Sequence, residues 1–79
     1  MNNTEKLKKA FSEALLIDES RVEDSLTYQS IPEWDSVSHM ILISEIESAF
    51  EISIETDDVI DMSSFAIAKE ILTKYDIAF

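Results

Sequence analysis

One serine in this chain, Ser36, combines a usable hydroxyl with a position that exposes it. It opens a strongly patterned helical segment and follows a non-helical run, residues 30–35, that holds the only proline. A hydroxyl at a helix start is accessible, and the positive end of the helix dipole favours a phosphate beside it. The pair Asp35-Ser36 therefore indicates an attachment point for a phosphate-linked group. The alternative is that Ser36 only caps the helix.

Other chemistry has little support in the sequence. There is no cysteine and no glycine, so thiolate chemistry and glycine-rich phosphate loops are excluded. The only histidine, His39, is expected to bond to the preceding loop rather than to act as a base. The acidic residues Glu55, Asp57, Asp58 and Asp61 lack the spacing and the glycine of a calcium loop, and no specific metal site is expected. Since nothing pairs a nucleophile with a base, the chain is not expected to be an enzyme.

Four helical segments would position Ser36. Residues 4–16 are expected to form the first helix, capped from residues 2–4, because their apolar residues share one helical stripe. That stripe consists of Leu7, Ala10, Phe11, Ala14 and Leu15. Residues 17–35 lack periodicity and predict a long loop with one turn of helix, pinned to the core by Leu26, Tyr28 and Ile31. Trp34 in this loop is either a packing residue or part of a rim that a modifying enzyme contacts.

The second helix, residues 36–50, carries two apolar faces. Leu42, Ile43, Ile46, Ala49 and Phe50 share the arc expected to face the core. Val37, Met40 and Ile41 lie on a different arc, bordered by Glu45 and Glu47. An apolar patch framed by carboxylates is typical of a docking surface. The alternative is a bundle that covers this helix on both sides.

Two further helices complete the pattern. Residues 55–60 read as a short third helix with acids in its first turn, where the helix dipole favours them. Ser63 or Ser64 is expected to cap a fourth helix. Its buried stripe would consist of Phe65, Ala68, Ile71, Leu72 and Tyr75. The predicted fold is all-α: a four-helix bundle with three long helices and one short helix.

Charge and length restrict the class of protein. The net charge is −11, and no Lys or Arg occurs between residues 22 and 68. This acidic stretch would repel nucleic acid and anionic membranes and attract basic protein surfaces. The 79 residues suit a single domain, residues 1–79, and contain no apolar signal or run of about 18 apolar residues. We expect a soluble, cytoplasmic monomer that binds neither nucleic acid nor membrane.

Taken together, these residues resemble the acyl carrier proteins. The resemblance covers nearly the whole chain: a long first helix, a long loop, Asp35-Ser36-Val37 opening the second helix, an acidic third helix after Ile54, and a fourth helix. It implies the four-helix bundle of that family. It also implies that a phosphopantetheinyl transferase attaches 4′-phosphopantetheine from coenzyme A to Ser36, within the Asp35-Ser36 motif. The thiol of the arm would hold acyl cargo as a thioester.

The resemblance also implies roles for other residues. Partners would be acyl-loading and acyl-processing enzymes with basic docking surfaces. Docking residues would be Val37, Met40, Ile41, Glu45, Glu47, Asp57 and Asp58. An acyl pocket in the bundle interior would be lined by Leu42, Ile46, Phe50 and Ile54.

Several positions depart from the carriers of bulk fatty-acid synthesis. Ile41 and Ser48 stand where that pattern has acids, and Trp34 precedes the Asp-Ser pair. These differences favour a carrier of a specialised pathway within fatty-acid, polyketide or related biosynthesis over a carrier of bulk fatty-acid elongation. A D-alanyl or aminoacyl carrier, which also uses Asp-Ser, remains open. So does an acidic helical adaptor without a prosthetic group, in which Ser36 would be only a cap.

Overall fold

All four predicted helices form in the computed structural model, which describes residues 2–79. They are α1 (Asn3–Leu15), α2 (Ser36–Phe50), α3 (Thr56–Asp61) and α4 (Phe65–Thr73), with one 3-10 turn, η1 (Glu19–Arg21), in the long loop. No strand forms in the described part of the chain; one isolated bridge joins Thr27 to Ser64. The protein is an all-helical small bundle, as its periodicity predicted. The second helix has the predicted bounds, and the first and third are each shifted by one residue.

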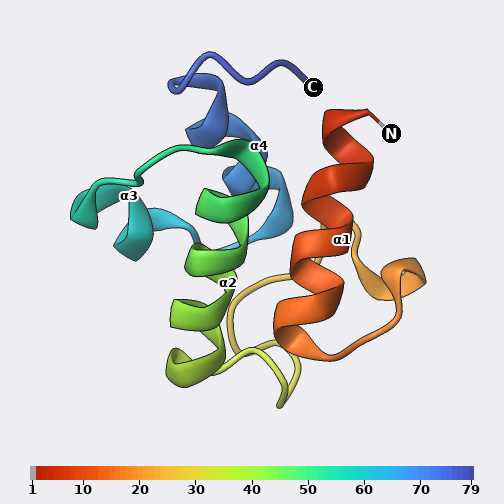
Figure 1. Ribbon diagram of the computed structural model, residues 1–79. Helices are drawn as coiled ribbons and strands as arrows, with labels where there is room; N and C mark the ends of the chain where they lie inside the picture. The colour runs from red at the N-terminus through yellow and green to blue at the C-terminus, as the bar shows by residue number, and fades with distance from the viewer. Residues whose placement is uncertain (1) are drawn as a thin grey trace.

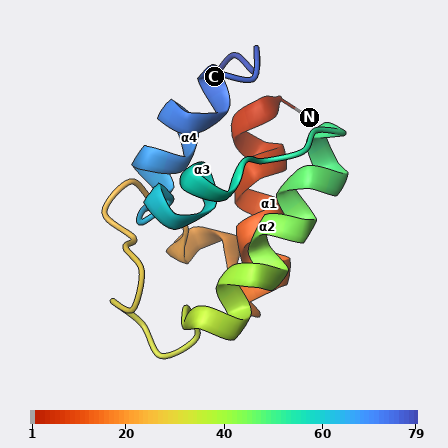
Figure 2. The same ribbon diagram turned by 90° about the vertical axis from the view of Figure 1, so that its left-hand side faces the viewer.

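The helices pack around α1 and α2, which lie side by side and run in opposite directions (Figure 1). The two termini lie at one end of the bundle, where the Asn3 side-chain amide donates to the Ala78 carbonyl oxygen (2.9 Å). The short helix α3 lies on the side of the molecule away from α1, as the rotated view shows (Figure 2). The start of α2, and with it Ser36, therefore lies at the end opposite the termini.

Side-chain caps fix the starts of α1 and α4. The Asn2 side chain accepts a hydrogen bond from the Glu5 N–H (2.8 Å), and the Ser64 hydroxyl accepts one from the Ile67 N–H (3.0 Å). Each cap satisfies a backbone donor that the helix itself leaves unpaired. Both residues were among the expected caps. Tyr75, which the sequence placed on the fourth helix, follows the end of α4 and is half-buried.

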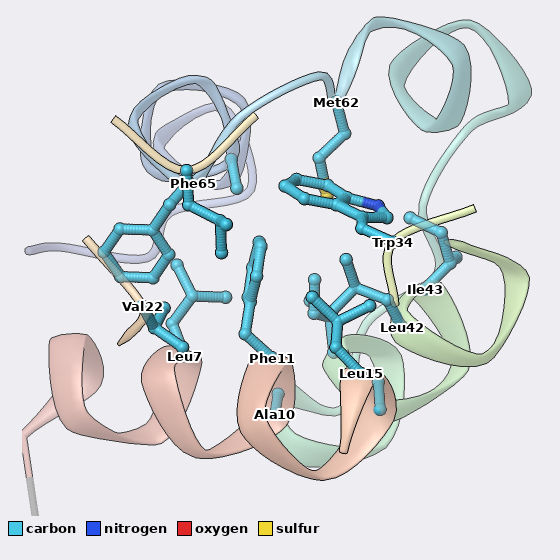
Figure 3. Close-up of a cluster of buried hydrophobic side chains, with 14 of the residues drawn as sticks. Leu7, Ala10, Phe11, Leu15, Val22, Trp34, Leu42, Ile43, Met62 and Phe65 are labelled. Atoms are coloured by element: carbon cyan, nitrogen blue, oxygen red, sulfur yellow. The ribbon is translucent and has the colours of Figure 1, made fainter. Parts of the chain in front are cut away.

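The core is aromatic at its centre. The predicted α1 stripe is buried in full, and Leu42, Ile43 and Ile46 of α2 face it. Phe11 makes edge-to-face contacts with Trp34 (ring centroids 5.4 Å apart) and with Phe65 (5.1 Å). Figure 3 shows Trp34 between Phe11 and Met62, at the centre of this cluster. Trp34 is 0% exposed, so it is a packing residue and not part of a surface rim.

The long loop is fastened to the start of α4. The Tyr28 N–H donates to the Ser63 carbonyl oxygen (2.8 Å), and the Phe65 N–H donates to the Leu26 carbonyl oxygen (3.0 Å). Leu26 is buried, while Tyr28 and Ile31 pack half-buried against the core, as expected. The loop is held both by the core and by α4. The position of the residues that follow it, at the start of α2, is therefore fixed.

Two helix ends use left-handed backbone without glycine. Leu16, which follows α1, has φ 57°, and Glu51, which follows α2, has φ 55°. A side chain with a Cβ is disfavoured there by about 1 kcal/mol. We expect Leu16→Gly to raise the free energy of unfolding by about 0.5–1 kcal/mol, since Leu16 is 87% exposed and loses no packing. Urea denaturation checks this. Leu16→Ala, which keeps the Cβ, should bring no gain.

Candidate functional site

Ser36 is the first residue of α2, and the residue before it performs the cap. The Asp35 carboxylate accepts a hydrogen bond from the Ser38 backbone N–H (2.9 Å), in the geometry of an N-cap. This hydrogen bond lowers the pKa of Asp35, so the carboxylate stays ionised at the positive end of α2. The capping role that was open for Ser36 therefore belongs to Asp35.

The Ser36 hydroxyl takes no part in holding the fold. The residue is exposed, and its hydroxyl has no hydrogen-bond partner within residues 2–79. The hydroxyl can thus be reached by another molecule without breaking a contact that holds the fold. That combination is what covalent attachment of a group requires.

A hydrogen-bonded bridge ties the start of α2 to the loop and to α3. The Trp34 indole N–H donates to His39 Nδ1 (3.0 Å), and His39 Nε2 lies 2.8 Å from the Val59 carbonyl oxygen. An indole can only donate and a carbonyl can only accept, so in this arrangement Nδ1 is the acceptor and Nε2 the donor. The expected bond from His39 to the loop is confirmed. Its second bond, to α3, was not foreseen.

Exposed apolar side chains surround Ser36. Val37 is 70% exposed, Met40 60% and Ile41 48%, so α2 does carry the uncovered apolar face that its pattern predicted. The alternative, a bundle that covers α2 on both sides, is wrong for these residues. Ile60 of α3 is 73% exposed and extends the patch across to the neighbouring helix. We call these four residues the apolar patch.

The acids expected beside the patch lie in four different settings. Asp57 is exposed in the first turn of α3. Glu45 instead lines a groove between α1 and α2 that also contains Lys6 and Lys9. Glu47 accepts the Ile54 N–H (2.8 Å) and so fastens the segment after α2. Asp58 differs most from the expectation, because it is buried.

Asp58 joins α3 to the end of α4. Its carboxylate accepts from the Lys74 ammonium group and from the Tyr75 hydroxyl, both at 2.6 Å. The same Tyr75 oxygen accepts from the Glu55 N–H (3.0 Å), so the first turn of α3 is held at two points. Since only 6% of Asp58 is exposed, its charge serves this internal contact and is not presented to a partner.

The hydrogen bonds change the ionisation of all three side chains. The bond from Lys74, and then that from Tyr75, holds the pKa of Asp58 below its ordinary value of 3.8. The bond to Asp58 raises the pKa of Lys74 above 10.5 and that of Tyr75 above 10.0. An acid whose pKa is lowered in the folded state stabilises the fold at pH values above its ordinary pKa. A base or phenol whose pKa is raised stabilises the fold at pH values below its ordinary pKa.

We therefore expect Asp58→Asn to lower the Tm by roughly 5 °C near neutral pH. The Tm difference from wild type should be constant between roughly pH 5 and pH 9. It should shrink as the pH falls through the lowered pKa of Asp58, and again as it rises through the raised pKa values of Tyr75 and Lys74. Thermal melts of both proteins across pH measure this. A difference that does not vary with pH would contradict the ionic contact.

A surface pocket of about 350 Å³ opens beside Ser36, between the loop, α2 and α3. Besides Ser36, it is lined by Tyr28, His39, Met40, Val59, Ile60, Met62 and Ser63. These are not the residues expected to line an acyl pocket. Leu42 and Ile46 are fully buried in the core, and Phe50 and Ile54 are half-buried beside it.

Sequence reasoning missed two contributions to this site. Ile60 completes the apolar patch, and Val59 receives the His39 bond, yet both looked like ordinary residues of a short helix. The available signal for exposure of Ile60 was its position in the sequence, where it lies among the acids Asp57, Asp58 and Asp61. Within residues 2–79, no group of three or more His, Asp or Glu side chains is arranged to hold a metal ion. None of the helices in that range is both long and apolar enough to cross a membrane.

Comparison of the chain with protein-family models, with curated proteins and with solved structures gave no match.

Proposed function

We propose that this protein is an acyl carrier protein that holds its cargo on a 4′-phosphopantetheine arm attached to Ser36. The observation that carries the proposal is the state of Ser36: an exposed, unbonded hydroxyl at the start of a 15-residue helix whose cap is supplied by Asp35. The N-terminus of such a helix favours the negative charge of a phosphodiester. The all-helical bundle and the order of its elements agree with the family that the sequence resembles.

The arm and the chain would have different roles in this function. The arm, when attached, would supply the thiol that this cysteine-free chain lacks. The chain's residues would fix the attachment point: Asp35 orders the first turn of α2, and the Trp34–His39–Val59 bridge holds that turn against α3. Tethering replaces free diffusion of the cargo by a high effective concentration at each partner site. No residue of the chain needs to act as a catalyst in this role.

The apolar patch and the acids that remain exposed support docking to basic partner enzymes. Val37, Met40 and Ile41 flank Ser36, and the patch continues to Ile60 of α3. Asp57 is exposed at the start of α3, while the whole region from residue 22 to 68 lacks any Lys or Arg. An acidic field of this kind speeds encounter with a basic surface, and a small apolar contact allows quick release. The partners would be a phosphopantetheinyl transferase and the enzymes that load and process the cargo.

A specialised biosynthetic pathway suits the residues around the site better than bulk fatty-acid synthesis. Ile41 and Ser48 stand where acids are common in the bulk carriers, and Trp34 fills the core behind the motif. We propose a cytoplasmic monomer, because the chain's excess of negative charge opposes self-association.

Loading with coenzyme A tests the proposal. The purified chain is incubated with coenzyme A, Mg²⁺ and a broad-specificity phosphopantetheinyl transferase, and its intact mass is measured. A gain of one phosphopantetheine per chain is expected. If a known carrier is modified in a parallel reaction and this chain is not, under any transferase tried, the carrier function is refuted and the adaptor is favoured.

A positive charge introduced into the patch should slow this loading. We expect Val37→Arg to lower kcat/KM of the transferase for this chain at least about 10-fold, since it puts a bulky cation at an apolar contact beside Ser36. The Tm should not change, because Val37 is 70% exposed. Leu16→Arg is the matched control: it is also exposed and apolar, but it follows α1 and lies outside the patch. Equal rates for both variants would show that the patch is not the docking surface.

A further inference from the structure

The pocket beside Ser36 ends at a wall that the chain builds from its own core. His39 lines the pocket, and behind it the Trp34 ring lies stacked at a centroid distance of 6.0 Å with an interplanar angle of 23°. Both His39 nitrogens are hydrogen-bonded, one to the loop and one to α3. Met62, which is 1% exposed, lies over Trp34 and closes the same end (Figure 3).

This wall separates the pocket from the bundle interior. A long chain entering from Ser36 would have to break both His39 hydrogen bonds and displace an indole that is packed edge-to-face on Phe11 and Tyr28. Interiors are packed as densely as organic crystals, so such a displacement has no free space to use. The volume of about 350 Å³ is near the lower limit of small-molecule sites, about 300–1,000 Å³.

We propose that this pocket is a binding site for a short apolar acyl group held on the arm of Ser36, and that the Trp34–His39 wall excludes longer chains from the bundle. The inference rests on the proposed carrier function. It identifies the cargo class as short acyl groups, because Met40, Val59 and Ile60 offer them an apolar lining and Ser36 stands at the rim. Tethering at Ser36 would make binding of the cargo in this adjacent pocket favourable even for a weak contact.

A series of acyl groups tests the inference. The chain is loaded from acetyl-, butanoyl-, octanoyl- and dodecanoyl-coenzyme A by a promiscuous transferase, and the mass confirms each product. Butanoyl is expected to raise the Tm by roughly 5 °C over the arm with a free thiol, because burial of its methylene groups stabilises the folded state. Dodecanoyl should add nothing beyond octanoyl. The NMR resonance of the Trp34 indole N–H should stay in place throughout the series.

Two exposed apolar residues provide matched variants. Met40→Ser removes a side chain that lines the pocket, and should lose most of the butanoyl effect. Leu16→Ser removes an exposed apolar side chain that lies outside both the pocket and the apolar patch, and should keep the effect. Both variants remain folded, since neither residue belongs to the core.

The outcomes separate the two proposals. A Tm that rises steadily up to dodecanoyl, with a displaced Trp34 resonance, would overturn the wall and show that the bundle shelters long chains. The absence of a butanoyl effect would overturn the pocket as a cargo site while leaving the loaded carrier intact. No mass gain with any coenzyme A derivative refutes the carrier function itself, and this inference with it.

Discussion

Replacement of Ser36 by alanine is expected to abolish attachment of phosphopantetheine completely and to leave the Tm unchanged within about 1 °C. The loss would be total because the Ser36 oxygen is the atom that would form the phosphodiester bond. The fold should be unaffected because the hydroxyl makes no hydrogen bond within residues 2–79 and the helix is capped by Asp35. Intact mass measures the loss of attachment, and thermal melting of the same sample measures the Tm.

Ser44→Ala is the matched control for this experiment. Ser44 is another exposed serine of the same helix, two turns further on, so its replacement tests for a general effect of losing a hydroxyl from α2. It should be loaded like the wild type. A Ser36→Ala protein that still gains the arm, or that keeps every cellular function of the wild type, would support the acidic adaptor in which Ser36 has no special role.

Replacement of Trp34 by alanine is expected to cost about 3–5 kcal/mol in the free energy of unfolding. A domain of this length has about 4–12 kcal/mol in total, so much of the protein would unfold near physiological temperature. Trp34 is 0% exposed and packs on both Phe11 and Tyr28. Its loss also leaves His39 Nδ1 without its donor. Urea denaturation followed by circular dichroism measures the change, since Trp34 is the only tryptophan available for fluorescence.

Trp34→Phe separates packing from hydrogen bonding. It keeps an aromatic ring but removes the indole N–H, and should cost only about 1–2 kcal/mol. If alanine and phenylalanine destabilise the protein equally, the hydrogen bond to His39, and not the packing of the ring, is the main contribution. If neither does, the central position of Trp34 in the core is wrong.

The helices and their buried faces could be predicted because the signals for them are local. The stripe of α1, the bounds of α2 and the Ser64 cap all follow from residues a few positions apart along the chain. The uncovered patch at Val37, Met40 and Ile41 could also be predicted, since a helical wheel separates two apolar arcs on one helix.

The environment of the acids could not be predicted, because their partners lie elsewhere in the chain. In the sequence Asp58 looks like an exposed acid of a short surface helix. Its carboxylate is buried because it accepts hydrogen bonds from Lys74 and Tyr75, which follow it by 16 and 17 residues. Glu45 turns to a groove beside α1 because that is where α1 and α2 meet. The pocket at Ser36 escaped prediction for the same reason: its walls come from the loop, α2 and α3 together.

The most direct test of the carrier function is the mass of this protein purified from the cells that naturally produce it. The account predicts a mass above that of the chain by one phosphopantetheine, alone or with cargo, and fragmentation should locate the addition on Ser36. A fully unmodified chain from cells in which other carriers bear the arm, or an addition on a different residue, would contradict it.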